Sequence, residues 1–448
     1  MGPYAGICTV ALVLAALSLL LAGGPAYDPW SWIVWGREVA HLHLITTGGP
    51  TWKPLPVVLT TLFAPFGAAA PDLWLVVARA GGIAAVGLAF ILTSRLAGER
   101  GRGTSVVAGG AAALGLLTLY QFAGGVATGE SEGLLVAMVL LAILRVVDGA
   151  PRQALALGFA AALLRPEVWP FLGAYGIWLW RRDAGARVLI AALFALIPAL
   201  WFLPELWGSG SLTRGVQWAQ YARQGSPAFA RCPFCSEISG SAWPLLTMPF
   251  RIGLALALGA AAFGFRSRAL AAVAALGLLW VLEEAALTQI GFSGSDRYLT
   301  APLALLIVSG AAGWGLALRR PRFALAALAV TVALSVVAFG RGPHLGAQFD
   351  AARLQGRIRG DLSAAVAEGG GAPRLLGCGA VQSNPSEAPL AAWTLGVPLS
   401  RTESERGDMV IQSGGASSPA LSPAAPAGYR LVADTAAVRL FVQPSCVR

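Results

Sequence analysis

A series of long apolar runs constrains this chain more than any other feature of its sequence. The runs lie at residues 7–23 and then roughly at 72–96, 105–122, 130–147, 153–180, 187–204, 248–265, 270–290, 299–318 and 323–340. A helix of ~20 residues crosses the hydrocarbon core of a bilayer. Because backbone polar groups in lipid must be paired within the chain, the runs predict a polytopic α-helical membrane protein.

The composition agrees with this class and argues against a soluble protein. Hydrophobic residues make up 56% of the chain and charged residues 12%, whereas soluble domains contain ~25% charged residues. A net charge of +10 would also suit a nucleic-acid partner. Most of the Arg residues, however, lie in short gaps between apolar runs, which is typical of cytoplasmic loops and indicates no nucleic acid.

Three stretches have interpretations of their own. The run 7–23 lacks the basic residues that precede the apolar core of a signal peptide, so we expect an uncleaved membrane helix. The run 153–180 is long for one helix, and we expect two segments that meet at Arg165-Pro166-Glu167. With both counted, the sequence predicts about eleven transmembrane helices. The stretch 55–66 is too short to span and predicts a helix on the membrane surface.

The placement of Arg orients the chain in a plasma membrane. Positively charged residues favour the cytoplasmic loops. With the N-terminus in the cytoplasm, the inner loops contain Arg95, Arg100, Arg102, Arg145, Arg152, Arg181, Arg182, Arg187, Arg266, Arg268, Arg319, Arg320 and Arg322. The outer side then holds the loop 24–71 with its surface helices, the loop 205–247, and the chain after residue 340.

Hydropathy falls after about residue 340, and this fall divides the chain. Residues 1–340 form the expected transmembrane core, and residues 341–448 form an expected soluble extracytoplasmic α/β domain. Within this tail, 349–368 has helical spacing, whereas 374–378, 409–413, 429–433 and 438–442 predict short strands. The stretch 413–427, rich in Ser, Pro and Ala, predicts a loop.

The cysteines predict two disulfides on the oxidising outer side of the membrane. Cys378 and Cys446 bracket the strand-like runs of the tail, and Cys232 and Cys235 form a CxxC in the loop 205–247. A CxxC can also be a redox motif or half of a zinc site. No second CxxC or nearby His completes a metal set, and no thioredoxin-like pattern surrounds the motif.

One segment places an acid and a base directly after the first apolar run. Asp28 follows that run, and Lys53, the one lysine among 32 basic residues, lies between an aromatic residue and Pro-Leu-Pro. Trp30, Trp32 and Trp35 suit a helix in the headgroup layer. An acid and a base at a membrane surface predict a reaction centre. The alternative is an ordinary polar loop beside an interfacial Trp belt.

Two acidic motifs lie on the same predicted outer side. Glu130 and Glu132 open an apolar helix, where the helix dipole favours carboxylates. Their oxygens can otherwise converge on a divalent cation such as Mg²⁺ or Mn²⁺, with Asp28 as a third ligand. Arg165 and Glu167 form either a structural ion pair at a helix break or a contact for substrate.

Charged residues near the last predicted helices complete the candidate set. Arg297 and Tyr298 precede the run 299–318 and have the composition of a contact for a phosphate headgroup, but an Arg that snorkels to the surface has the same signature. Glu283 and Glu284 lie inside an apolar run. An ionised carboxylate costs ~2.5–3.5 kcal/mol there, so these two residues predict a polar cleft or a substrate contact.

These motifs resemble those of the GT-C membrane glycosyltransferases, nearest the protein O-mannosyltransferase and aminoarabinose transferase branch. Tyr27-Asp28-Pro29 is similar to the acidic start of that branch, and Trp52-Lys53-Pro54-Leu55-Pro56 to its Lys-Pro-Pro motif. Glu130-x-Glu132 resembles a second acidic motif of oligosaccharyltransferases. The chain departs from the pattern in its single acid at position 28 and in Leu55.

The resemblance implies a GT-C-like fold and transfer of a sugar from a polyprenyl-phosphate-linked donor to a hydroxyl of an extracytoplasmic glycan, lipid or protein. It implies Asp28 as the general base and Lys53, Arg165 and Arg297 as contacts for the lipid phosphate. One alternative is a membrane transporter or lipid flippase that uses the glutamates of the run 270–290. Another is an inactive scaffold. Transporter sites usually lie at the membrane midplane, whereas these polar features gather on the outer side.

Overall fold

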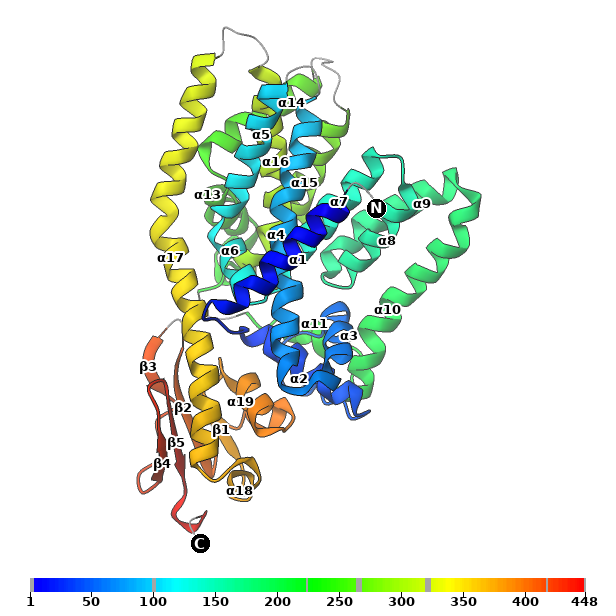
Figure 1. The fold of residues 1–448 in the computed structure, drawn as a ribbon. Coiled ribbons are helices and arrows are strands. Elements are labelled where there is room, and N and C mark those ends of the chain that lie inside the picture. The colour runs from blue at the N-terminus through cyan, green and yellow to red at the C-terminus, as the bar shows by residue number, and fades with distance from the viewer. Residues whose placement is uncertain are drawn as a thin grey trace.

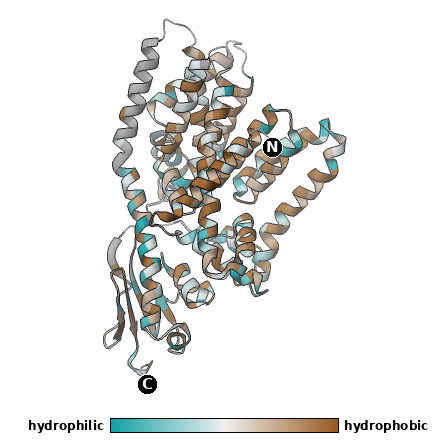
Figure 2. Ribbon diagram, in the orientation of Figure 1, coloured by the Kyte–Doolittle hydropathy of each residue, from teal (hydrophilic) through white to brown (hydrophobic). Residues whose placement is uncertain are grey.

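The computed structural model describes residues 4–98, 102–222, 225–262, 268–318, 324–415 and 418–446. Figure 1 shows a helical bundle above a small α/β part, and one long helix, α17 (Ala324–Glu368), runs from the bundle to the sheet. Apolar residues are concentrated on the bundle helices (Figure 2). This distribution fits a multi-pass membrane protein with a small C-terminal sheet.

The bundle consists of helices of very different lengths. It contains α1 (Ala5–Leu17), α4 (Ala70–Ala97), α5 (Arg102–Leu117), α6 (Tyr120–Ala127), α7 (Glu132–Val147), α8 (Pro151–Ala162), α9 (Trp169–Arg182), α10 (Arg187–Ser209), α14 (Met248–Ala262), α15 (Arg268–Gln289) and α16 (Thr300–Ala317). Among the described residues, four helical stretches are long and apolar enough to cross a membrane, or six if each bent pair counts as one span. The expectation of about eleven crossings also counts shorter helices.

Helix α16 lies at the centre of the bundle. Every residue from Thr300 to Gly313 is buried, and α4, α5, α14 and α15 pack around it. A Cβ atom on Gly313 would overlap the carbonyl oxygen of Gly253 on α14. Small residues at such crossings let helix backbones approach closely within a membrane. The close α14–α16 contact therefore depends on glycine at these positions.

The predicted interruption at residues 165–167 is present in the structure. Helix α8 ends at Ala162, a 3₁₀ turn, η3 (Pro166–Val168), follows, and α9 begins at Trp169. Arg165 has an extended backbone conformation, as expected for a residue before proline. The break places Arg165 at a helix junction, where its side chain can reach neighbouring elements.

The loop 24–71 contains two helices, one largely buried and one with an exposed apolar face that includes Val58 and Leu62. They are α2 (Tyr27–Ala40) and α3 (Pro54–Phe63). The expectation of an interfacial Trp belt is wrong, because Trp30, Trp32 and Trp35 are all buried. Helices α3 and α4 pack on α2, and so does α19 (Ala388–Leu395) of the C-terminal part. Helix α2 is therefore buried by these neighbouring helices and does not lie on the membrane surface.

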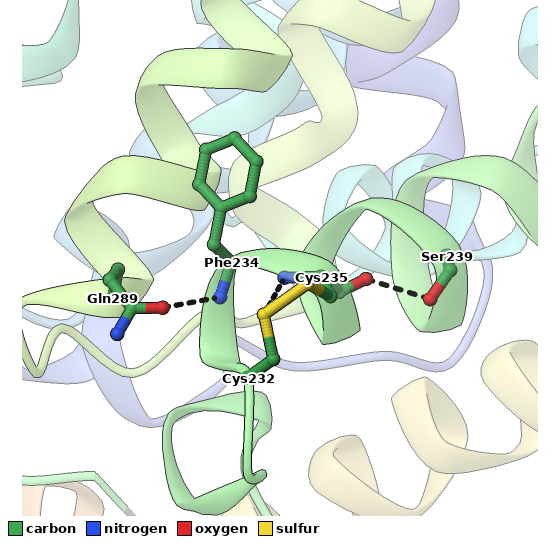
Figure 3. The surroundings of a disulfide bond; sticks show 5 residues. All are labelled: Cys232, Phe234, Cys235, Ser239 and Gln289. Atoms are coloured by element: carbon green, nitrogen blue, oxygen red, sulfur yellow. Dashed lines mark hydrogen bonds between the residues drawn. A yellow bond between two sulfur atoms is a disulfide. The ribbon is translucent and has the colours of Figure 1, made fainter.

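The loop 205–247 contains the end of α10 and several short helical segments. Among these are α11 (Arg214–Ala219), α12 (Pro233–Ser236), the π-helical turn η6 (Glu237–Ala242) and α13 (Trp243–Leu245). Cys232 and Cys235 are joined by a disulfide at the start of α12. Figure 3 shows that the neighbouring backbone N–H of Phe234 donates to Oε1 of Gln289 at 3.1 Å. The disulfide turn is thereby attached to the end of α15.

The C-terminal part is a mixed sheet packed against the second half of α17. The strands are β1 (Val381–Ser383), β2 (Met409–Gly415), β3 (Ser418–Ser422), β4 (Arg430–Asp434) and β5 (Val438–Val442). Their order is β1-β2-β5-β4, with β3 paired to β2; β1 and β2 are parallel and the other pairs antiparallel. Helix α17 contacts β4 and β5. A disulfide joins Cys378 to Cys446.

Three details of the tail differ from the sequence-based expectation. The run 374–378 is not a strand, because α18 (Ala372–Leu376) begins there with Pro373 in its first turn, a position that favours helix. The stretch 413–427 is not entirely a loop, because β3 forms within it by pairing with β2. The helix expected at 349–368 is the end of the 45-residue α17, which continues across the predicted boundary at 340.

Candidate active site

The site begins at the N-terminus of α2, where Asp28 lies in the first turn. Proline at the next position suits a first turn, and the helix dipole favours a carboxylate there. Asp28 is buried, and its Oδ2 lies 2.9 Å from Nη1 of Arg297. The same Nη1 lies 3.5 Å from Oε2 of Glu130. One guanidinium thus connects the acid after α1 with the acid before α7.

Arg297 reaches this position from the 3₁₀ turn η7 (Asp296–Leu299), which leads into the central helix α16. Burial, followed by the nearby Asp28 carboxylate, raises the pKa of Glu130 to about 8. The raised pKa favours the protonated form of Glu130, which makes Asp28 the principal charged partner of Arg297.

Lys53 forms the second part of the site. It immediately precedes α3, whose first residue is Pro54, and its side chain is buried. Its Nζ donates to Oγ of Ser131 at 3.0 Å and lies 4.0 Å from Oε1 of Glu132. The ammonium also lies 4.8 Å from the ring centroid of Trp32, within cation–π range. Burial lowers the pKa of Lys53, and the positive charge of Arg165 lowers it further.

Arg165 connects the remaining predicted residues. Its Nη2 donates to Oε1 of Glu132, and its Nη1 lies 3.6 Å from Oε1 of Glu167. The guanidinium lies 4.1 Å from the ring centroid of Tyr298, while that of Arg297 lies 5.4 Å from the same ring. Tyr298 therefore contacts both guanidinium groups.

The structure thus brings most of the predicted site residues into one cluster, which is largely buried except at Arg297, whose side chain is 33% exposed. Basic and acidic side chains alternate through it. The cluster contains Asp28, Lys53, Glu130, Glu132, Arg165, Glu167, Arg297 and Tyr298. A buried set of cations can hold an anionic ligand strongly, because water screens their charges little there. A carboxylate beside such an anion can accept a proton.

Glu283 and Glu284 lie beside this cluster on α15. Glu284 is 3% exposed, and Oε2 of Glu283 is buried without a hydrogen-bond partner among the described residues. Their helix packs against η3, which carries Glu167. The pair therefore approaches the cluster through α15 and η3, without a hydrogen bond or ion pair to it among the described residues.

The carboxylates of the cluster face guanidinium groups rather than one another. Asp28 and Glu130 converge on Arg297, and Glu132 faces Arg165. Across the described residues, no three His, Cys, Asp or Glu side chains are grouped so as to hold a metal ion. The sequence left both the divalent cation and helix capping open for Glu130 and Glu132, and removal of metal by a chelator distinguishes the two.

Two contacts were not anticipated from the sequence. Ser131 accepts a hydrogen bond from Lys53, and the ring of Trp32 lies beside the same ammonium. Ser131 was detectable in principle, because it lies between the two predicted glutamates. The sequence predicts that Trp32 is an interfacial residue. Its contact with Lys53 instead arises from the packing of α2 against α3.

The fold resembles two crystal structures of ArnT from Cupriavidus metallidurans, one bound to undecaprenyl phosphate and one in the apo state. The TM-score is 0.54 for the first, with 16% sequence identity over 97% of both chains. It is 0.55 for the second, with 15% identity over 97% of this chain and 96% of the other. No protein-family model matches the sequence, and no curated protein matches it. Along nearly its whole length the chain therefore has the fold of ArnT, which confirms, at the level of the fold, the resemblance to the aminoarabinose transferase branch of the GT-C membrane glycosyltransferases.

Proposed function

We propose that this chain is a membrane glycosyltransferase that moves a sugar from a polyprenyl-phosphate-linked donor to an acceptor hydroxyl outside the cell. The observation that carries the proposal is the convergence of Lys53, Arg165 and Arg297 with Asp28 in one largely buried cluster that stays open to solvent at Arg297. The binding of undecaprenyl phosphate to a structure of the same fold supports a polyprenyl-phosphate partner.

In this proposal the three cations hold the phosphate of the donor. The lipid phosphate is a poor leaving group unless its negative charge is neutralised. Fixed cations that are shielded from water neutralise this charge well. Arg297 has two roles in this proposal, because it binds the phosphate and is also the ion-pair partner of Asp28. A phosphate that binds Arg297 competes with Asp28 for that guanidinium and frees the carboxylate to meet the acceptor hydroxyl.

The proposed reaction is a direct displacement at the anomeric carbon. Asp28 accepts the proton of the acceptor hydroxyl while that oxygen forms the new bond to the sugar. The bond between the anomeric carbon and the phosphate oxygen breaks, and its electron pair leaves with the lipid phosphate. The products are the glycosylated acceptor, polyprenyl phosphate and a protonated Asp28.

The proposal includes the orientation inferred from Arg placement. The N-terminus lies in the cytoplasm, about eleven helices cross the membrane, and the loops 24–71 and 205–247 face outward. Residues 1–340 form the catalytic core, and residues 341–448 form an extracytoplasmic domain. Glu167, Glu283, Glu284 and Tyr298 contact the sugar or the headgroup in this arrangement.

The experiment is a turnover assay with purified protein in detergent and a pool of polyprenyl-phosphate-linked sugars extracted from membranes of the native host. Envelope glycans and lipids serve as acceptors. We expect the protein to release free polyprenyl phosphate, and the Asp28→Asn variant to release far less. Movement of intact donor across a liposome bilayer without cleavage would instead support a flippase.

A further inference from the structure

A glutamate of the C-terminal part contacts the two outer segments that carry the proposed base and the proposed phosphate ligand. Glu403 follows the 3₁₀ turn η9 (Leu399–Arg401). Its Oε1 accepts a hydrogen bond from the Tyr27 hydroxyl at 3.1 Å and another from the backbone N–H of Gly49 at 3.2 Å. Glu403 remains exposed to solvent, so these contacts are not a by-product of core packing.

The two hydrogen-bond donors to Glu403, Tyr27 and Gly49, lie close in sequence to Asp28 and Lys53. Tyr27 directly precedes Asp28, and Gly49 lies shortly before Lys53 in the segment that leads into α3. Glu403 therefore joins the start of α2 to the start of α3. The distance between the proposed base and the proposed phosphate ligand depends on how these two helix starts are held.

The backbone around Gly49 is shaped to receive this carboxylate. A Cβ atom on Gly48 would lie 2.5 Å from Oε2 of Glu403, and Gly49 has a φ of +83°, which favours glycine. Arg214 of α11 holds the next part of the segment, because its Nη1 donates to the carbonyl of Pro50 at 2.7 Å. The segment before Lys53 is thus held by Arg214 through its carbonyls and by Glu403 through an N–H.

The C-terminal part also contacts α2 further along the helix. Nη2 of Arg37 donates to the carbonyl of Val397 at 2.8 Å, and the rings of Trp30 and Trp393 lie 6.2 Å apart. The carboxylate of Glu403 is therefore fixed relative to α2 by other contacts of the same domain. The hydrogen bond from Tyr27 to this carboxylate therefore helps to fix the position of Tyr27.

We propose that Glu403 is a positioning residue through which the C-terminal domain sets the separation of Asp28 and Lys53. This inference rests on the proposed function. Glu403 touches neither lipid phosphate nor sugar. It acts by fixing the helix start that bears Asp28, so its loss lowers the rate of transfer more than it weakens donor binding.

The test uses the full-length protein and the turnover assay described above. Glu403→Ala and Tyr27→Phe are each expected to lower kcat about 5- to 10-fold, the size expected for loss of one hydrogen bond of ordinary net strength, with KM for the donor within about twofold. Glu403→Gln keeps an acceptor oxygen and should retain most of the activity. Glu405→Ala, an exposed neighbour in the same loop, is the matched control and should match the parent.

A second comparison separates positioning from general destabilisation. In an Asp28→Asn background, where no base remains to be positioned, adding Glu403→Ala should not lower the residual turnover further. The proposal is overturned if Glu403→Ala lowers turnover by the same factor in both backgrounds, or matches Glu405→Ala. Should Glu403→Ala fail to fold, Tyr27→Phe, which removes one hydroxyl, answers the same question.

The two proposals fail in different ways. If Asp28→Asn transfers sugar at the parent rate, the proposed function is wrong. If Asp28→Asn is inactive while Glu403→Ala and Tyr27→Phe both retain parent kcat, the proposed function stands and the role of Glu403 is wrong.

Discussion

Nη1 of Arg297 lies 2.9 Å from Oδ2 of Asp28, so the proposed general base is paired with a proposed ligand of the leaving phosphate. The two residues come from opposite ends of the bundle sequence, one from the first turn of α2 and the other from the turn that opens α16. In the proposed mechanism the lipid phosphate therefore competes with Asp28 for the guanidinium of Arg297.

The first prediction concerns Asp28. Asp28→Asn keeps size and polarity but cannot accept a proton, so we expect turnover to fall by ~10²–10⁴-fold. Binding of undecaprenyl phosphate should change far less, because the three cations remain. Turnover and lipid binding measured on the same preparation check this. Asp434→Asn, at an exposed site on β4, is the control and should behave as the parent.

The second prediction concerns Lys53. Replacing it with Met keeps most of the side-chain volume beside Trp32 but removes the charge, so affinity for undecaprenyl phosphate should fall roughly 10- to 100-fold. Native mass spectrometry or a lipid-dependent thermal shift measures this. Arg439→Met, which removes an exposed cation from β5, should bind normally. Equal affinity in the parent and Lys53→Met proteins would remove Lys53 from the phosphate site.

The third prediction is a pH dependence that comes from Glu130. Its raised pKa of about 8 keeps it neutral at pH 7, and above pH 8 its carboxylate competes with the lipid phosphate for Arg297. Affinity for undecaprenyl phosphate should therefore fall roughly tenfold from pH 7 to pH 9. Glu130→Gln is neutral at both pH values and should remove this loss. A Glu130→Gln protein with the parent's pH profile would assign the titration elsewhere.

The fourth prediction concerns divalent cations. Glu130 and Glu132 already face Arg297 and Arg165, so we expect EDTA to leave turnover unchanged. The measurement is turnover of protein dialysed against EDTA, with and without added Mg²⁺ or Mn²⁺. Activity that disappears in EDTA and returns with one metal would restore the metal hypothesis and redirect these carboxylates from their cations.

The fifth prediction tests orientation. A Cys8→Ser variant leaves Cys232, Cys235, Cys378 and Cys446, all of which are expected outside the cell. After mild reduction of intact cells, a membrane-impermeant thiol reagent should label the loop that contains Cys232. Lysed cells give the total for comparison. Labelling that requires lysis would place this loop in the cytoplasm and exclude the proposed reaction side.

The sequence predicted the helical membrane class well, because apolar runs report directly on burial in lipid or protein. The break at Arg165 was predictable for an equally local reason, since proline interrupts helix hydrogen bonding. The strand β5 was predictable from the strand-like run at 438–442, and in the structure Val438, Leu440 and Val442 are buried while the residues between them are more exposed. The run 374–378 is too short for periodicity to distinguish a strand from a helix. Pro373, just before it, is the local signal that favours the start of a helix.

The contacts of the site were not predictable in the same way. The candidate residues were chosen by type and by position near apolar runs, and that choice carried no information on partners. The pairing of Asp28 with Arg297 depends on how α2 docks against α16, which no local pattern encodes. The burial of Trp30, Trp32 and Trp35 likewise depends on the packing of α3, α4 and α19 around α2.

The order in which the chain is made has a consequence for the buried charge cluster. Asp28, Glu130 and Glu132 are synthesised well before Arg297. Until the ribosome has passed η7, the ion pair that neutralises Asp28 cannot form, and an unpaired charge at a membrane is costly. Closure of the cluster is therefore a late event in biogenesis, and a chain truncated before η7 leaves Asp28 without its ion-pair partner.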